Sequence, residues 1–343
     1  MFLTHISTDH AEVLGRALVA ACRLDGWQAP TQPRLLTTLF HELLGKDYDF
    51  ETLEPNAAEE AATVLESPEE RHELVQLMCM VEILCTEASP EMEQSVAAWA
   101  TKLGVPERSL VYLRDLAEGE VRKTLEDFYR LNWIGDLSHR TPGFAKLREL
   151  GAEAYASTVE VDPDKAARYD NLKSFPEGSL GRYLYEFYQE RGFAFPGEEG
   201  AASEAVAHHD WIHLLADYGT TPLGEIEVLS FMNGSSRSPG VFLGLIGALA
   251  LFESAIMGEG FVTVAYPGQG LSRDRGPDRM AEAVKRGNAC KTDLLLDVEF
   301  FSMADEPLVD LRERFEIPPR SDWAQALDPW GALGNEPVPP PGT

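Results

Sequence analysis

The sequence predicts an all-α protein built from two helical domains. Apolar residues recur at spacings of three and four along most of the chain, whereas the alternating pattern expected of strands is scarce. A length of 343 residues exceeds what one hydrophobic core usually organises. With 44% hydrophobic and 25% charged residues, the composition is that of an ordinary globular protein.

The first predicted domain, residues 1–135, contains a repeated pair of helices. Helical spacing over residues 10–45 is interrupted at Asp25-Gly26 and Pro30, which predicts two helices joined by a tight turn. A similar pattern returns about 60 residues later, passes through Ser89-Pro90 and ends at Gly104. Two similar helix pairs are therefore expected here.

The turn of the first pair reads Leu24-Asp25-Gly26-Trp27-Gln28-Ala29-Pro30. It resembles the tellurite-resistance TerB-like domain, whose halves carry an acidic Asp-Gly turn before a Ser/Ala-Pro step. The second half has Cys85-Thr86-Glu87-Ala88 in place of Asp-Gly. The resemblance therefore implies a TerB-like helical bundle, but not the paired acidic metal site.

A connection is expected at residues 136–165, where glycine and proline accumulate after helical signals that end near Trp133. The second predicted domain spans residues 166–325, with helices expected at 180–188, 201–217, 222–233 and 240–257. Residues 326–343 are predicted to form a disordered proline-rich tail, because residues 334–343 contain almost no apolar material to offset the entropy of ordering.

A candidate metal site lies in the segment His208-His209-Asp210-Trp211-Ile212-His213. The i, i+4 spacing places His209 and His213 on one face of a helix. Asp210 cannot share that narrow face, so two roles stay open for it: binding the flank of the metal, or orienting an imidazole.

The next helix should return a carboxylate to these histidines. Thr221 is a suitable N-cap, Pro222 suits the first helical position, and Glu225 follows closely. Two histidines with one or two carboxylates suit zinc or another first-row divalent ion, with a position left for water or substrate. The alternative is a chance histidine pair on a solvated helix.

The flanking sequence argues against chance. The chain contains Pro176-Glu177-Gly178-Ser179-Leu180-Gly181-Arg182, and eleven residues separate His209-Asp210-x-x-His213 from Glu225. Both motifs resemble the coenzyme Q biosynthesis protein 4 family. Further matches to this family are Ala283 to Gly287, Asp297-Val298-Glu299, Pro307-Leu308 and Leu311-Arg312. Val298 stands where the family usually has a tryptophan. The resemblance covers roughly residues 165–320.

This resemblance implies that His209, Asp210, His213 and Glu225 bind a divalent ion, usually taken as zinc. It also implies an enzyme that removes the ring carboxylate of a polyprenylated hydroxybenzoate, oxidatively or not, in ubiquinone or related quinone biosynthesis. His208 is a candidate proton shuttle, or else faces solvent. Two alternatives remain: a non-catalytic, lipid-binding organiser of other quinone-biosynthesis proteins, and a stress-response paralogue.

The uncharged run from Pro239 to Phe252 is too short to cross a bilayer. It is predicted to be a buried core helix, with close approach at Gly244 and Gly247; the alternative is a channel for an isoprenoid tail. The candidate residues for contact with substrate or lipid are Phe242, Leu245, Leu249 and Arg279. Arg279 belongs to a local basic excess at 273–291 that could instead form a solvated helix with pairs such as Glu282 and Arg286.

The charge and the cysteine content indicate which partners and which cellular compartment to expect. A net charge of -28, from 57 acidic and 29 basic side chains, argues against a nucleic-acid partner. The four cysteines show no C-x-x-C spacing and the first residues do not form a secretory signal. We expect a cytoplasmic protein with a prenylated aromatic or other lipid-like ligand; a peripheral position at the inner face of the membrane and a homodimer are further alternatives.

Overall fold

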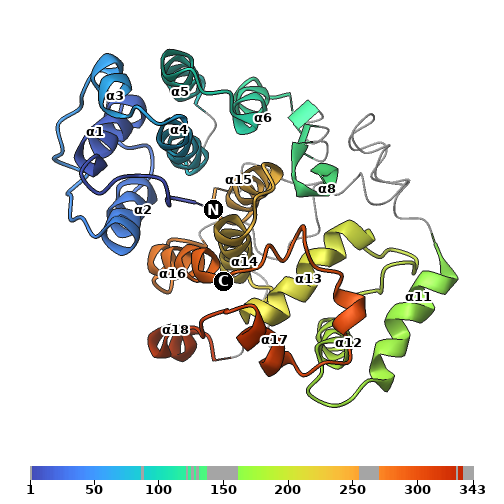
Figure 1. Cartoon of the computed structure of the whole chain (residues 1–343). Helices are drawn as coiled ribbons and strands as arrows, with labels where there is room; N and C mark the ends of the chain where they lie inside the picture. Colours follow the sequence, from blue (N-terminus) through green and yellow to red (C-terminus); the bar gives the residue numbers. More distant parts are fainter. Residues whose placement is uncertain are drawn as a thin grey trace.

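The computed structural model describes residues 2–85, 89–120, 123–124, 127–128, 131–136, 161–254, 270–329 and 331–334. Within these ranges the chain folds into helices joined by turns, with no strand, which confirms the all-α prediction (Figure 1). None of the described helices combines the length and the apolar character needed to span a bilayer.

The N-terminal half contains the two predicted helix pairs, α1 with α2 and α4 with α5. Ser67 and Ser89 cap α4 and α5, and each is followed by a proline at the first helical position. All four cysteines are buried as free thiols, as small apolar residues would be. The helices of this half are α1 (Ala11–Cys22), α2 (Thr31–Leu39), α3 (Ala58–Val64), α4 (Pro68–Ile83), α5 (Pro90–Leu103) and α6 (Arg108–Ala117), with a π-turn, η1 (Phe40–Leu44), after α2.

The C-terminal half has a helix at each of the four predicted places. These are α12 (Leu180–Arg191), α13 (Glu204–Ala216), α14 (Pro222–Ser235) and α15 (Gly240–Phe252). The remaining helices are α8 (Trp133–Asp136), α11 (Pro163–Asp170), α16 (Gly276–Ala289), α17 (Leu308–Arg314) and α18 (Asp322–Leu327), with short 3-10 turns at η3 (Asn171–Ser174) and η4 (Phe300–Met303).

Helix α14 lies at the centre of this half, between α13, α15 and α16 (Figure 1). Its contact with α16 is backbone to backbone. A Cβ at Gly234 would lie 2.5 Å from the carbonyl oxygen of Val284, and one at Gly287 would lie 2.1 Å from that of Phe231. Two glycines therefore set the distance between these helices.

Helix α15 joins the two halves. It packs against α4, α6 and α8, and the buried apolar side chains of both halves form one continuous cluster. A Cβ at Gly244 or Gly247 would overlap the ring of Trp133 or Phe128, so the predicted close approach at these glycines is confirmed. The N-terminal end adds to the contact, because Phe2 stacks on Phe242 with ring centroids 5.9 Å apart.

Phe242, Leu245 and Leu249, which were considered for contact with lipid, lie in the same core. All three side chains are at most 2% exposed and belong to the shared core. The structure thus supports the core interpretation of α15.

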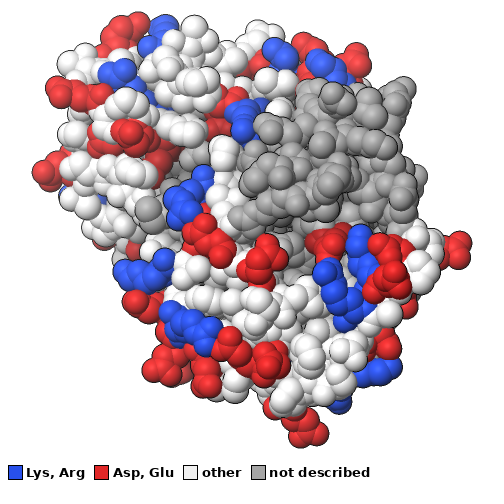
Figure 2. Space-filling model, turned by 45° about the vertical axis from the view of Figure 1, so that its right-hand side comes forward, with Lys and Arg blue, Asp and Glu red and all other residues white. Residues whose placement is uncertain are grey.

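On the face in Figure 2, carboxylate and basic side chains are interspersed over the described surface.

The predicted boundary of the tail at residue 326 is too early. Leu327 completes α18, the Asp328 carboxylate accepts hydrogen bonds from Arg279 and Arg320, and Ala332 is fully buried. The ion pairs of Asp328 and the burial of Ala332 hold this segment in place. Residues 335–343 of the predicted tail, and 137–160 of the predicted connection, lie outside the described residues.

Candidate metal centre

Helices α13 and α14 form the predicted hairpin. Helix α13 ends at Asp217 in the left-handed conformation, and the Thr221 hydroxyl accepts the Gly224 N–H to cap α14 at Pro222. A Cβ at residue 224 would lie 2.3 Å from the carbonyl oxygen of Gly219, so only glycine fits there. The tight turn brings Glu225 back to the histidines, as the sequence predicted.

The four predicted ligands meet at this hairpin. One donor atom from each of His209, Asp210 and His213 lies within 4.8 Å of the others. Oε2 of Glu225 lies 3.6 Å from Nε2 of His209 and 3.5 Å from Nε2 of His213. Ligands about 2.1 Å from a tetrahedral zinc ion lie about 3.4 Å from one another, so these separations fit a shared cation.

His213 presents an unused lone pair to this cluster. The side chain is fully buried, and its Nδ1 lies 3.0 Å from the carbonyl oxygen of Tyr218. Because a carbonyl oxygen only accepts, Nδ1 carries a proton, and in the neutral imidazole Nε2 is then the acceptor. That Nε2 has no hydrogen-bond partner within the described residues. A buried nitrogen without a partner costs free energy, and a metal ion would satisfy it.

His209 is oriented in the same way. Its Nδ1 lies 2.5 Å from the carbonyl oxygen of Val206, which leaves Nε2 on the side of Glu225. Asp210 has one oxygen 3.3 Å from Nδ1 of His209, and its other oxygen accepts the Tyr188 hydroxyl at 2.5 Å. Asp210 thus orients His209 while its carboxylate also lies among the candidate ligands.

The electrostatics of the site favour a cation. Burial alone lowers the pKa of His209, but Asp210 and Glu225 outweigh it and raise the pKa to about 9. Burial raises the pKa of Glu225, yet the two histidines dominate and place it well below its usual range. Burial also raises the pKa of Asp210. Carboxylates that stabilise a protonated imidazole also stabilise a metal ion, so proton and metal compete here.

His208 is not brought into the cluster. Its Nε2 lies 3.4 Å from the carbonyl oxygen of Leu294, and its ring packs 4.7 Å from the ring centroid of Phe300. The candidate proton shuttle is therefore engaged elsewhere in the fold.

Arg279 faces neither lipid nor substrate. It is 4% exposed, and its guanidinium donates to both carboxylate oxygens of Glu227 and to Asp328. The alternative of solvated i, i+4 pairs on this helix is also wrong for Glu282 and Arg286. Glu282 accepts from Ser321, and the buried Arg286 donates to the carbonyl of Pro318.

Sequence reasoning missed Tyr188 and the carbonyl group of Tyr218. Tyr188 lies on α12 among other aromatic residues, and nothing in its spacing distinguishes it from Tyr183 or Tyr185. A carbonyl group carries no sequence signal at all.

Comparison of the chain with protein-family models, with curated proteins and with solved structures gave no match. The site therefore has to be interpreted from its own geometry and from the motifs in its sequence.

Proposed function

We propose that this chain is a metal-dependent enzyme of ubiquinone or related prenylated-quinone biosynthesis, which removes the ring carboxylate of a polyprenyl-hydroxybenzoate. His209, His213 and Glu225 bind the ion, with Asp210 beside them. The observation that carries the proposal is the unpartnered, fully buried Nε2 of His213, 3.5 Å from the Glu225 carboxylate. The H-D-x-x-H and P-E-G-S-L-G-R motifs resemble those of the coenzyme Q biosynthesis protein 4 family, and this resemblance suggests the substrate class.

The donor set defines which ion the site suits. Imidazole nitrogens with carboxylate oxygens fit zinc or another first-row divalent ion better than calcium or magnesium. When bound, such an ion would supply Lewis-acid stabilisation to a phenolate or carboxylate oxygen. The chain itself keeps the two imidazoles in the required tautomer through the carbonyls of Val206 and Tyr218.

The proposed reaction also needs a proton. Loss of carbon dioxide leaves an electron pair on the ring carbon, and in the non-oxidative form that carbon takes up a proton. His208, bonded to Leu294, is not placed to give it, so we assign this step to water entering the site. A polyprenyl substrate resides in the bilayer, and we accordingly propose that the protein works at the cytoplasmic face of the membrane.

The first test is elemental analysis of the purified protein beside a His209→Ala, His213→Ala double variant. His208→Ala is the matched control, because it removes a histidine from the same helix outside the cluster. Each protein is checked by circular dichroism and incubated with a prenylated hydroxybenzoate, and product is followed by mass spectrometry. We expect one zinc ion per chain and turnover in the wild type and in the control, and neither in the double variant.

Two other outcomes would change the conclusion. Stoichiometric metal without turnover would favour the lipid-binding organiser over the enzyme. Absence of metal from a folded wild-type protein supplied with zinc would remove the basis of the proposal.

A further inference from the structure

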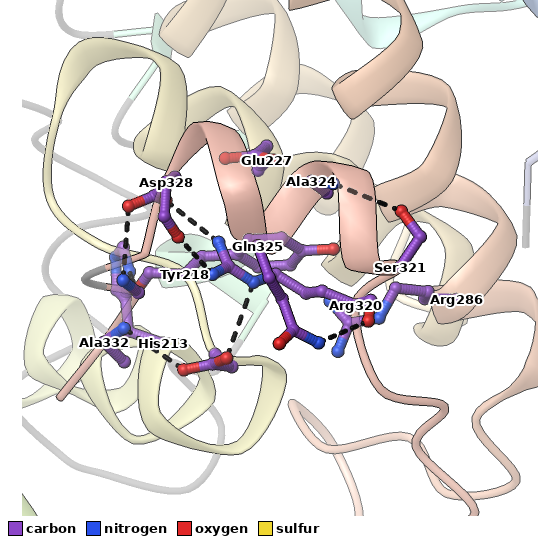
Figure 3. A network of polar contacts seen from close by, with 12 residues as sticks. His213, Tyr218, Glu227, Arg286, Arg320, Ser321, Ala324, Gln325, Asp328 and Ala332 are labelled. Carbon is purple, nitrogen blue, oxygen red and sulfur yellow. Dashed lines mark hydrogen bonds and ion pairs between the residues drawn. The ribbon is translucent and has the colours of Figure 1, made fainter.

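The turn between the candidate metal ligands is covered by a segment from much later in the chain. We define the metal-site turn as residues 217–221 and the C-terminal segment as residues 320–329 with 331–334. The turn lies midway between His213 and Glu225 in sequence. Figure 3 shows His213 and Tyr218 beside Arg320, Asp328 and Ala332, which belong to the C-terminal segment.

Asp217 makes the direct contacts. Its Oδ1 accepts the main-chain N–H of Ala332 at 3.3 Å, and its Oδ2 lies 3.4 Å from Nε of Arg320. Arg312 approaches the same carboxylate at 3.7 Å and donates to the carbonyls of Leu214 and Leu215, at the end of α13. One side chain thus connects the turn to the C-terminal segment and to α17.

On the C-terminal segment, the residue that faces the Asp217 carboxylate is a glycine, Gly331. Gly331 has a φ of +49°, and a Cβ there would lie 2.6 Å from Oδ1 of Asp217. A side chain at this position would displace the Asp217 carboxylate from its contact with Ala332, and the positive φ would add strain. At the other end of the turn, Arg191 donates to the Thr220 hydroxyl and to the carbonyl of Gly334.

The C-terminal segment is itself firmly anchored. Arg320, 4% exposed, donates to the carboxylate and to the main-chain carbonyl of Asp328. Asp328 also accepts from Arg279, whose other contacts are with Glu227 on α14. Buried charges joined in this way are costly to separate, because each one left alone is desolvated and unpaired.

The turn acts on the metal site through Tyr218. The carbonyl of this residue accepts the Nδ1–H of His213 and so aims Nε2 at the cluster. We propose that Asp217, Gly331 and Arg320 are positioning residues: the C-terminal segment clamps the metal-site turn, and the clamped turn sets the orientation of His213 and its distance from Glu225. This inference rests on the proposed metal function.

The test uses Asp217→Asn in the full chain. Asparagine tolerates the left-handed conformation and keeps an acceptor oxygen, so the substitution removes the charge that attracts Arg320 and Arg312. We expect zinc affinity, measured by competition with a chromogenic chelator, to fall about tenfold, as for other partners of metal-bound histidines. We also expect the visible absorption spectrum of the Co²⁺-substituted protein to change, while the far-ultraviolet circular dichroism stays the same.

Asp293→Asn is the matched control. Asp293 is a buried aspartate that bonds Ser236 and Arg237 after the opposite end of α14, away from the turn. Its loss should lower the melting temperature and leave the Co²⁺ spectrum unchanged. Gly331→Ala is the second test variant, since it disturbs the same contact from the other segment; it should weaken zinc binding in the same direction as Asp217→Asn.

The outcomes separate this inference from the proposed function. A wild-type protein that binds neither zinc nor Co²⁺ contradicts the proposed function. A wild type that binds one ion, with unchanged affinity and spectrum in both Asp217→Asn and Gly331→Ala, overturns the clamp alone. Equal losses in Asp293→Asn also overturn it, because they would reflect general destabilisation; should Asp217→Asn not fold, Gly331→Ala decides.

Discussion

Both halves of the chain pair histidines with buried carboxylates, and they do so in two different ways. In the N-terminal half, His5, His10 and His72 each meet one glutamate, namely Glu73, Glu70 and Glu107, at 2.6 to 2.9 Å. In the C-terminal half, His209 and His213 converge on the single carboxylate of Glu225.

The N-terminal pairs are already satisfied. Each glutamate also accepts main-chain N–H groups, from Thr4 to Glu73 and from Ser109 to Glu107, for example. Each histidine side chain is a third to a half exposed. Among the described residues, such donors converge around a nitrogen without a partner only at the α13–α14 hairpin. The comparison teaches that convergence and an unmet bonding need, rather than residue type, distinguish a candidate metal centre from a structural ion pair.

The strongest test of the difference between the two kinds of pair is to remove one histidine from each half. His213→Ala should abolish stoichiometric zinc binding and turnover, because it removes a buried ligand, whereas His72→Ala should retain both. The measurement is metal content after dialysis beside product formation. Loss of metal in His72→Ala would show that the two kinds of pair are not distinct.

A second comparison asks whether the two halves unfold together. Phe2 is 1% exposed and contacts α15 and α16 through Phe242 and Asn288. Phe2→Ala should lower the free energy of unfolding by about 3 kcal/mol, as for other fully buried phenylalanines. Urea unfolding followed by circular dichroism should show one transition, because one core spans both halves; two transitions, with only one shifted, would contradict a shared core.

Removal of the metal from the C-terminal half should lower the stability of the whole chain. At zinc concentrations about 100 times the dissociation constant, a single site adds about 2.7 kcal/mol to the free energy of unfolding. A chelator should therefore lower the melting temperature of the wild type. Glu107→Gln, which alters an N-terminal pair, should keep this zinc-dependent increment, whereas Glu225→Gln should lose most of it.

The smallest expected effect is the pH dependence of the His72–Glu107 pair. The hydrogen bond that His72 donates to the Glu107 carboxylate raises the pKa of His72 in the folded protein. The stabilisation is therefore complete below the unfolded pKa of about 6.5 and is lost as pH rises through the higher folded pKa. Because the imidazole is 46% exposed, we expect less than about 1 kcal/mol. Melting curves of His72→Gln from pH 5 to pH 9 should lack this loss; an unchanged profile would assign it to another group.

Much of the fold and of the site could be predicted from local sequence. Helical periodicity predicted the helices, Thr221 and Pro222 predicted the start of α14, and spacing predicted the meeting of His209, His213 and Glu225. These features depend on residues that are close in sequence.

The remaining features depend on contacts between distant residues. Arg279 and Glu227 are 52 residues apart, and Asp217 and Ala332 are 115 residues apart. A basic residue in a basic stretch gave no sign that it would be buried against a glutamate, and the residues next to Asp328 gave no sign that this carboxylate would anchor the C-terminal segment. Such pairings are fixed by tertiary packing, which periodicity does not encode.

The same long-range contacts impose an order on biosynthesis. Helix α14 carries Glu225, yet it packs backbone to backbone on α16, and the turn before it is bonded to Ala332. A ribosome will have released His209, His213 and Glu225 well before it adds the residues that hold them in place. The hairpin therefore precedes its supporting segment during synthesis, and the centre should reach its full affinity for a metal ion only after residue 332 has been translated.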